Sequence, residues 1–341
     1  MSHPLPLQDL EHVVSEVGSL WKILSGKRVL FTGASGFFGS WMLETFLHAG
    51  TTLDLPFRAL ALTRNTKRFS EHLPHIACDP RVEIMESDAA TMPDPNGPVD
   101  YLVHSLVPDA GTPLTQKDLI FRSATQRLLD IALQKNSRAF LLCSTGAVYQ
   151  PKNPPAPFSE DDPLVPLDAP LSYGLIRRRL EDQCRSALEK SGVALKIARG
   201  FAFVGPRLPL DANFAIGNFI RDSLAGGPII VKGDGSPIRS YLYAADMAAW
   251  LWKILLQGTC GSAYNVGSSE STTISDLAKS IADLFATDVR IEHAPAPGNA
   301  PSCYLTRTDY ELSPAKLVSM PESLNRTARW HQPSPSMQAS P

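Results

Sequence analysis

Several features that would mark a secreted, metal-binding or membrane protein are missing from this chain of 341 residues. Its five cysteines lie far apart and form no C-x-x-C pair. This argues against a disulfide framework or a zinc site and is typical of a reducing compartment. No apolar run reaches the ~18 residues that a membrane helix needs, and no basic segment precedes an apolar core as in a signal peptide. We therefore expect a cytoplasmic protein without membrane contact.

An excess of charge of one sign is also missing. The chain has 32 lysines and arginines against 34 aspartates and glutamates, so its formal net charge is −2. Such a balance gives no indication of nucleic acid or an anionic membrane as partner. Hydrophobic residues make up 43% of the chain, as in globular proteins, and its length provides core for one large domain or two modest ones.

The chain is organised around a segment with the pattern of a strand, a glycine turn and a helix. A short apolar run from Lys27 to Thr32 is followed by Gly33, Gly36 and Gly39, and then by apolar residues at helical spacing. Gly33 permits the tight turn, Gly36 lets the backbone approach a pyrophosphate, and Gly39 lets the helix lie close to the strand. The N–H groups of the first helical turn face the anion. We predict that this loop binds a dinucleotide, with contacts from Gly33, Ser35, Gly36, Phe37, Phe38 and Gly39.

Alternating strand and helix patterns predict an α/β fold: a Rossmann-type doubly wound parallel sheet with a smaller C-terminal substrate-binding lobe. An amphipathic helix is expected before the first strand, because apolar residues from Leu10 to Leu24 follow a 3.6-residue period. Further strands are expected at 57–63, 82–85, 99–105, 139–145 and 193–199, and helices at 117–136, 173–190 and 244–256. The expected domains are a helical lead at 1–26, a nucleotide-binding domain at 27–205, a lobe at 206–331 from which 240–267 returns to the first domain, and a frayed tail at 332–341.

The end of the second predicted strand bears on the choice of cofactor. An acidic residue there would bind the ribose 2′-hydroxyl of NAD, whereas an arginine accommodates the 2′-phosphate of NADP. The sequence has Arg64 at this place, which favours NADP(H) over NAD(H), unless Arg64 is an ordinary surface arginine. Asp88, after the third predicted strand, either reaches an adenine edge or is a solvated turn residue. His104, at the end of the fourth, is expected to be a packed histidine rather than a ligand.

With these residues in view, the chain resembles the extended short-chain dehydrogenase/reductases, in particular the NAD-dependent epimerase/dehydratase branch that acts on nucleotide sugars. The resemblance covers about residues 27 to 290, and five motifs occur in the family's order. They are Thr32-Gly33-x-x-Gly36-Phe37-x-Gly39, Ser144 to Tyr149, Tyr173-x-x-x-Arg177 with Glu181, Arg199 to Pro206, and Gly233-Asp234-Gly235-x-x-x-Arg239 with Tyr243 and Asp246.

The resemblance implies a nucleotide-sugar substrate, a bound NADP or NAD, and three catalytic residues. Tyr173 would exchange a proton with a sugar hydroxyl, and Thr145 would hold the same oxygen. Arg177, at i+4 from the tyrosine, would supply the positive charge that a phenolate needs, since positions i and i+4 share a helix face. Arg177 and Tyr173 would also contact the cofactor. The substrate-binding residues are expected to be Ser144, Thr145, Asn213 and Arg239, with Arg239 on the diphosphate.

The chain departs from the family pattern at three places. Arg177 stands where relatives have lysine, and arginine is planar and hydrogen-bonds differently. Gly146 and Ala147 stand where dehydratases have an Asp-Glu pair, so 4,6-dehydration is not favoured. Ala202-Phe203 occupies a place where many relatives have asparagine, which predicts a more apolar substrate pocket.

Three functions remain open from the sequence. The first is a nucleotide-sugar epimerase that oxidises and re-reduces one carbon, and the second is a 4-keto-sugar reductase that consumes NADPH. The third is a cofactor-binding protein with weakened or lost catalysis, to which Arg177 points. By resemblance, a homodimer is expected to form through the helices at 117–136 and 173–190.

Overall fold

Seven parallel strands form the central sheet of the protein. The computed structural model describes residues 3–212, 214–294, 301–307 and 312–332, and the predicted tail from 333 onward lies outside these ranges. The strand order is β11-β6-β5-β4-β1-β2-β3, so the chain reverses direction across the sheet between β1 and β4. This confirms the predicted doubly wound fold, in which ligands bind at such a switch point. The strands are β1 (Arg28–Thr32), β2 (Arg58–Thr63), β3 (Val82–Glu86), β4 (Tyr101–His104), β5 (Ala139–Thr145), β6 (Ala194–Gly200) and β11 (Ala263–Val266).

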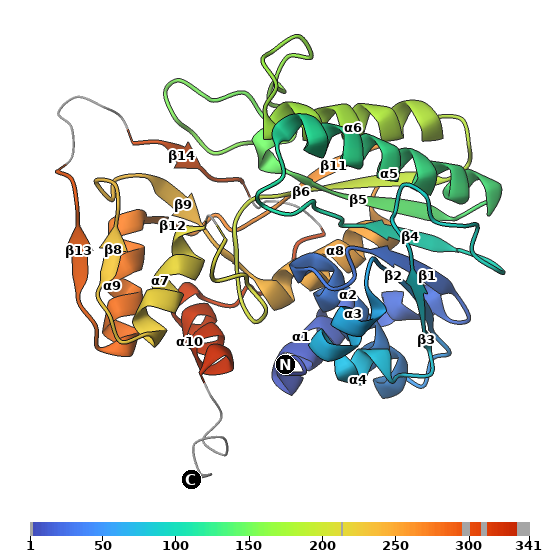
Figure 1. Cartoon of the computed structure of the whole chain (residues 1–341), viewed down its shortest axis with the longest axis horizontal. Coiled ribbons are helices and arrows are strands. Elements are labelled where there is room, and N and C mark those ends of the chain that lie inside the picture. Colours follow the sequence, from blue (N-terminus) through green and yellow to red (C-terminus); the bar gives the residue numbers. More distant parts are fainter. Residues whose placement is uncertain (1–2, 213, 295–300, 308–311, 333–341) are drawn as a thin grey trace.

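Helices cover both faces of this sheet, and each face has its own hydrophobic core (Figure 1). One face is covered by α1 (Leu7–Val17), α2 (Phe37–Thr52) and α8 (Ala244–Gln257), and the other by α5 (Leu114–Gln134) and α6 (Tyr173–Leu188). The short helices α3 (Thr66–His72) and α4 (Pro74–Ala77) connect β2 to β3. No helix in the described part of the chain combines the length and the apolarity needed to cross a bilayer.

Two helices differ in extent from the pattern-based expectation. The N-terminal helix ends at Val17 and continues as the 3-10 helix η1 (Gly18–Leu24), because Gly18 takes a φ of 57° that breaks the α-helical path. Helix α5 begins three residues before the predicted start at 117 and ends at Gln134. Asn136, the predicted last residue, has a φ of 51°, a left-handed conformation that asparagine tolerates at the end of a helix.

A smaller lobe follows the sixth strand. It contains α7 (Ala215–Leu224), α9 (Ile274–Phe285), α10 (Met320–His331) and the short strands β8 (Ile229–Val231), β9 (Ile238–Ser240), β12 (Ser271–Thr273), β13 (Val289–Ile291) and β14 (Cys303–Tyr304). Thr273 caps α9, since its hydroxyl oxygen accepts the Asp276 N–H at 3.0 Å. Two further short strands, β7 (Phe203–Val204) and β10 (Leu242–Tyr243), pair with each other beside α8. At β10 and α8 the chain therefore leaves the lobe and returns to the large domain.

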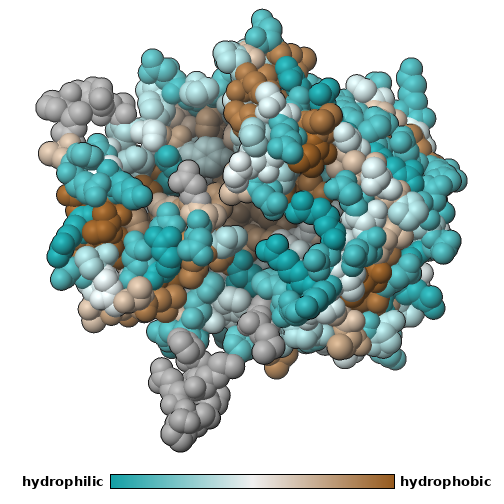
Figure 2. All heavy atoms as spheres, viewed as in Figure 1, coloured by the Kyte–Doolittle hydropathy of each residue, from teal (hydrophilic) through white to brown (hydrophobic). Residues whose placement is uncertain are grey.

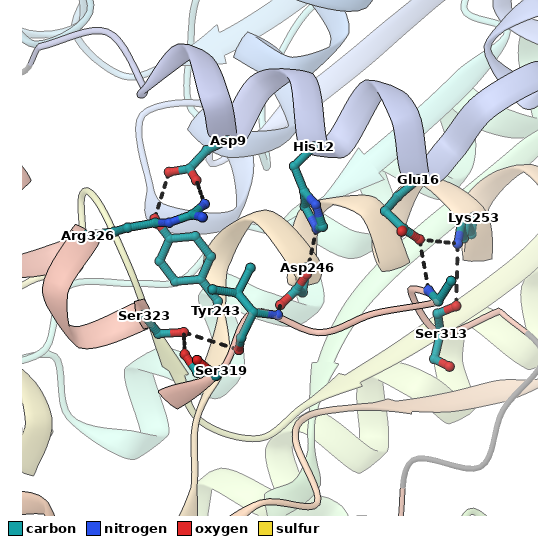
Figure 3. A network of polar contacts seen from close by, with 12 residues as sticks. Asp9, His12, Glu16, Tyr243, Asp246, Lys253, Ser313, Ser319, Ser323 and Arg326 are labelled. Carbon is teal, nitrogen blue, oxygen red and sulfur yellow. Dashed lines mark hydrogen bonds and ion pairs between the residues drawn. The ribbon is translucent and has the colours of Figure 1, made fainter. Parts of the chain in front are cut away.

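A polar network fastens the N-terminal helix to the rest of the molecule (Figure 3). The fully buried carboxylate of Asp9 accepts the Tyr243 hydroxyl and an N–H of Arg326, both at 2.7 Å. His12 Nε2 lies 2.7 Å from Asp246 Oδ1, while the other oxygen of Asp246 accepts the Val318 N–H. Tyr243 and Asp246, which belong to the last of the five motifs, therefore join α1, α8 and the C-terminal segment.

The contact between His12 and Asp246 predicts a dependence of stability on pH. The hydrogen bond that the His12 ring donates to the Asp246 carboxylate raises the pKa of His12 above its usual 6.5, although burial opposes this, and Glu16 and Asp9 on the same helix add to the rise. Because the folded state holds the proton more tightly, this stabilisation is complete below pH 6.5 and is lost as the pH rises through the folded pKa. We expect the melting temperature of His12→Gln to vary less than that of the native protein between pH 5.5 and 8.5. His48→Gln is the control. Burial lowers the pKa of His48, so replacing this residue should not reduce the fall in melting temperature as the pH rises.

Candidate active site

A cavity of about 870 Å³ opens at the carboxyl ends of the sheet strands. It runs from the glycine loop after β1 past the ends of β2, β4, β5 and β6, and the C-terminal lobe closes its far side. Figure 2 shows the hollow between the two parts of the molecule. Eleven of the residues predicted for the site line this cavity: Gly33, Ser35, Gly36, Phe37, Phe38, Arg64, Asp88, Ser144, Thr145, Tyr173 and Arg177.

The glycine loop is built so closely that side chains would not fit in it. Gly33 has a φ of 65°, and a Cβ there would lie 2.7 Å from the carbonyl oxygen of Ser105. A Cβ on Gly39 would lie 2.2 Å from the carbonyl oxygen of Gly33, so the first turn of α2 rests directly on the loop. Gly39 is buried and does not line the cavity, whereas Gly33, Ser35 and Gly36 do. Such a cradle at a helix N-terminus fits a pyrophosphate.

Arginine side chains, not an acid, follow the second strand. Arg64 and Arg68 line the cavity there, and Arg64 is 63% exposed with one contact of 3.4 Å to Asp109. Glu86, at the end of β3, accepts the Thr66 N–H. Asp88 lines the cavity, but one of its oxygens accepts the Ala90 N–H at 2.8 Å, as in an Asx turn. Both interpretations of Asp88 therefore remain compatible with its position.

His104 is a packed histidine, as expected. It is 2% exposed and lies between the hydroxyls of Thr32, at 2.9 Å, and Thr125, at 3.0 Å. Burial lowers its pKa to about 3, with a smaller contribution from the charge of Arg177, so the ring is neutral. His104 thus holds the ends of β1 and β4 to α5.

Tyr173 and Thr145 face the cavity from adjoining elements. Thr145 ends β5, and Tyr173 is the first residue of α6, whose N-cap Ser172 accepts the Leu175 N–H. The second residue of α6 is glycine, and a Cβ on Gly174 would lie 2.0 Å from the carbonyl oxygen of Ala147. The first turn of α6 therefore presses against the turn that follows Thr145.

Arg177 lies one helical turn after Tyr173 and is 2% exposed. Its Nη2 donates to the carbonyl oxygen of Cys143, and its guanidinium carbon lies 4.6 Å from the centre of the Phe121 ring. The same ring is 6.4 Å from that of Tyr173. Two buried nitrogens of Arg177, Nε and Nη1, have no hydrogen-bond partner within the described chain. Buried donors without a partner on a cavity wall fit a ligand with hydroxyl or carbonyl oxygens, such as a cofactor ribose.

Ser144 is turned toward a buried ion pair. Its hydroxyl donates to Glu181 at 2.6 Å, and the same carboxylate accepts Arg199 N–H groups at 2.7 and 3.1 Å. Arg199 also donates to the Tyr149 hydroxyl, which in turn donates to the side-chain oxygen of Asn265. The two charged side chains are at most 4% exposed. Ser144 thus has a partner within the protein and serves to fix the strand end beside Thr145.

Tyr304 is a residue near the site that sequence reasoning missed. Its hydroxyl lies 3.5 Å from Thr145 Oγ1, and its ring packs 4.8 Å from that of Phe201. A Cβ on Gly146 would lie 2.8 Å from this hydroxyl, so the glycine makes room for it. Burial raises the pKa of Tyr304 to about 12, which keeps the phenol neutral. In the sequence, the one indication of Tyr304 is the missing side chain at Gly146, which leaves space for its hydroxyl.

One predicted substrate ligand is not brought into the cavity. Arg239 does not line it, and one of its nitrogens, Nη1, donates to the carbonyl oxygens of Ile238 and Ser302 at 2.8 and 3.1 Å. Arg239 lies on β9 of the C-terminal lobe, where it pairs in register with Tyr304 of β14. Asn213 lies outside the described residues.

Comparisons with known proteins agree with this geometry. UDP-glucuronic acid decarboxylase 1 of Danio rerio is 26% identical over 321 residues, which cover 89% of this chain and 72% of the relative. UDP-N-acetyl-alpha-D-glucosaminuronate decarboxylase of Bacillus cytotoxicus is 28% identical over 278 residues, covering 79% of this chain and 84% of the relative. The solved structure of UDP-glucuronic acid 4-epimerase from Bacillus cereus, in complex with UDP-glucuronic acid and NAD, superposes with a TM-score of 0.72. It shares 19% identity over 89% of this chain and 98% of that one, and it supports the fold.

The family model of the NAD dependent epimerase/dehydratase family matches residues 29–267. This range contains the glycine loop, Thr145, Tyr173 and Arg177, and the family's dependence on NAD agrees with the expected NAD or NADP cofactor. The chain belongs to the NAD-dependent epimerase/dehydratase family of extended short-chain dehydrogenase/reductases.

Proposed function

We propose that the protein is an NAD(P)-dependent nucleotide-sugar oxidoreductase of the epimerase type, which oxidises and re-reduces one carbon of the sugar. The observation that carries this proposal is that Thr145, Tyr173 and Arg177 line one cavity together with the glycine loop. Among the described residues, the acidic side chains on the cavity wall are Glu71, Asp88 and Asp109, all near the ends of β2, β3 and β4. The described residues at the Tyr173 end of the cavity include no acidic side chain, which disfavours an elimination reaction that needs a carboxylate.

The three side chains have distinct tasks in this proposal. Tyr173, as phenolate, accepts the proton of a sugar hydroxyl, and the Thr145 hydroxyl donates a hydrogen bond to the same oxygen. A bound nicotinamide would take up the hydride from the carbon and later return it. Tyr173 then gives its proton back to the oxygen. The first turn of α6 and the guanidinium of Arg177 place positive charge near the phenolate and stabilise it.

In this proposal arginine serves where relatives have lysine, and two contacts of its side chain support this. The guanidinium carbon lies 4.6 Å from the centre of the Phe121 ring and Nη2 donates to the Cys143 carbonyl oxygen, so the position of the group is set on two sides. Its free Nε and Nη1 remain available to a cofactor ribose.

A second candidate, decarboxylation of a nucleotide-linked uronic acid, is favoured by the names of the two relatives described above. Oxidation of the ring carbon β to the carboxylate makes loss of carbon dioxide easy, and Tyr173 could then protonate the resulting enolate. A third, reduction of a 4-keto sugar by NADPH, is favoured by Arg64 and Arg68 at the cofactor end.

One experiment separates these functions. The cofactor released from purified protein is identified by mass spectrometry, and the loaded protein is then incubated with nucleotide sugars. An epimerase returns a product of unchanged mass without net use of cofactor, whereas a decarboxylase releases carbon dioxide and a reductase consumes NADPH one for one. If neither NAD nor NADP binds, the proposal fails.

Arg177→Lys distinguishes an enzyme from a cofactor-binding protein that has lost catalysis. Lysine cannot stack flat on Phe121 and has no second nitrogen for the ribose. We propose that this variant is no faster than the native protein. A large gain in turnover from an almost inactive native protein would instead favour lost catalysis.

Arg64 is expected to determine which nicotinamide dinucleotide is preferred. If its guanidinium binds a 2′-phosphate, Arg64→Ala should weaken NADPH binding by about tenfold, the loss of roughly one charge-assisted hydrogen bond, and leave NADH binding unchanged. Lys67→Ala is the matched control, because Lys67 is 86% exposed and does not line the cavity. The two dissociation constants are measured by fluorescence titration, and equal effects on both cofactors would contradict the assignment.

We further propose that two copies pair through α5 and α6. Leu119 on α5 is 59% exposed, and it lines a surface hollow together with Arg122, Ser123 and Gln126 of α5 and Arg179 and Gln183 of α6. An apolar side chain in a polar surround fits the core of a modest interface.

A further inference from the structure

The hydroxyl of Thr145 contacts two groups of the protein itself. As the N-cap of the 3-10 turn η2 (Gly146–Val148), its oxygen accepts the Ala147 N–H at 3.2 Å. The Tyr304 hydroxyl lies 3.5 Å from the same oxygen. Thr145 lines the cavity, whereas Tyr304 is not among the described residues that line it. Tyr304 therefore contacts the threonine from within the protein and not from the cavity.

The strand that carries Tyr304 is fixed on two sides. Tyr304 of β14 pairs in register with Arg239 of β9 in the C-terminal lobe. Just after it, the Leu305 carbonyl oxygen accepts the Phe158 N–H at 2.8 Å, and the Arg307 N–H donates to the Phe158 carbonyl oxygen at 3.1 Å. Phe158 is 5% exposed, so this second anchor belongs to the interior. The phenol is thus held in place by backbone bonds on both sides of β14.

Two glycines make room for this segment beside the end of β5. A Cβ on Gly146 would lie 2.8 Å from the Tyr304 hydroxyl, and a Cβ on Gly267 would lie 2.8 Å from the Cγ2 methyl group of Thr306. Any side chain at these positions would therefore push β14 away from Thr145. The close approach of the lobe at this point depends on both glycines.

The direction of the hydrogen bond between the two hydroxyls decides what Thr145 can do. A hydroxyl oxygen carries one proton and two acceptor sites. Burial raises the pKa of Tyr304 to about 12, so the phenol keeps its proton. A phenol is also a more acidic hydroxyl than that of threonine, and the more acidic partner donates. With the Ala147 N–H and the Tyr304 O–H on its oxygen, Thr145 has its own proton left for an acceptor in the cavity.

We propose that Tyr304 is a positioning residue, which donates to Thr145 Oγ1 from the C-terminal lobe and so directs the Thr145 proton toward the sugar oxygen. The inference rests on the proposed function, in which this oxygen gives its proton to Tyr173. A hydrogen bond from Thr145 strengthens as negative charge gathers on the sugar oxygen, so its effect lies in the transition state more than in substrate binding.

Kinetics of Tyr304→Phe test this role. Turnover is measured with NAD-loaded protein and the UDP- and dTDP-linked forms of glucose, N-acetylglucosamine and glucuronic acid. We expect kcat to fall about three- to tenfold, the contribution of one neutral hydrogen bond, and KM to stay nearly unchanged. Tyr101→Phe removes a buried phenol from the first residue of β4, at the other end of the sheet, and as the control should change neither constant.

Two other results of this measurement overturn the inference. A tyrosine that only supported the shape of the site would raise KM when replaced. A tyrosine that accepted the Thr145 proton would, when replaced, free that proton for the sugar and raise kcat.

A double-mutant cycle shows whether Tyr304 acts through Thr145. Thr145→Val keeps nearly the same shape but removes the hydroxyl, so in this variant Tyr304→Phe should cause no further loss of kcat. Thr145→Ser serves if the valine variant does not fold. Serine keeps the hydroxyl but lacks the methyl group that restricts χ1, so Tyr304→Phe should lower kcat more there than in the native protein. An equal or smaller loss in the serine variant contradicts the inference.

The outcomes separate this inference from the function on which it rests. If the native protein turns over one of these sugars and the losses from Tyr304→Phe and Thr145→Val multiply, the inference is wrong and the proposed function stands. If the native protein binds NAD but turns over none of the sugars, the proposed function fails and the inference fails with it.

Discussion

Replacing Tyr173 with phenylalanine is expected to lower kcat by about 10²- to 10⁴-fold, the usual contribution of a positioned acid or base. The ring would keep its place beside Phe121 at the start of α6, so folding and cofactor binding should change little. Only the oxygen that exchanges a proton with the sugar is removed. Single-turnover measurements with the loaded variant, together with a cofactor titration, test both parts of this expectation.

Tyr304→Phe is the matched control for this variant. Tyr304 also places a phenol near Thr145, at 3.5 Å, but burial raises its pKa to about 12, so it is a poor base. We expect a loss of less than about tenfold, that of one neutral hydrogen bond. Equal losses in the two variants would contradict the assignment of Tyr173 as the acid and base.

The cofactor end of the site could be predicted because its chemistry is local in the sequence. Gly33, Gly36 and Gly39 lie within seven positions of one another, and at Gly33 and Gly39 any side chain would clash with the backbone. The strand before them and the helix after them are long enough to leave clear apolar periods. Tyr173 and Arg177 could likewise be placed on one helix face, because they lie four positions apart in a segment with a clear helical pattern.

The substrate end could not be predicted in the same way, because it is assembled from distant short segments. Tyr304 belongs to β14, a strand of two residues without a pattern of its own. Ser144 lines the cavity, and its hydroxyl also donates to Glu181, a partner on another element that local spacing does not indicate. Arg239 fits its motif, but bonds to Ile238 and Ser302 fix its position outside the cavity. Contacts of this kind, between residues far apart in the sequence, cannot be predicted from the spacing of neighbouring residues.

Glu181→Ala is expected to cost about 3–5 kcal/mol of folding free energy, because it leaves the buried charge of Arg199 without its partner. Both side chains are at most 4% exposed, and their shortest contact is 2.7 Å. The Ser144 hydroxyl loses its acceptor in the same step. Urea unfolding followed by circular dichroism measures the change, and a loss below about 1 kcal/mol would show that the pair is not needed.

Two further variants show whether the loss of folding free energy comes from removing the negative charge of Glu181. Glu181→Gln keeps the shape and one acceptor oxygen but removes the negative charge, so most of the destabilisation should remain if the uncompensated Arg199 causes it. Glu189→Ala, on the exposed C-cap of the same helix, should change stability by less than about 0.5 kcal/mol. Because Ser144 adjoins Thr145, the glutamine variant should also lower kcat more than it raises KM. A stable glutamine variant with native kinetics would instead show that the network requires the shape of Glu181 and not its charge.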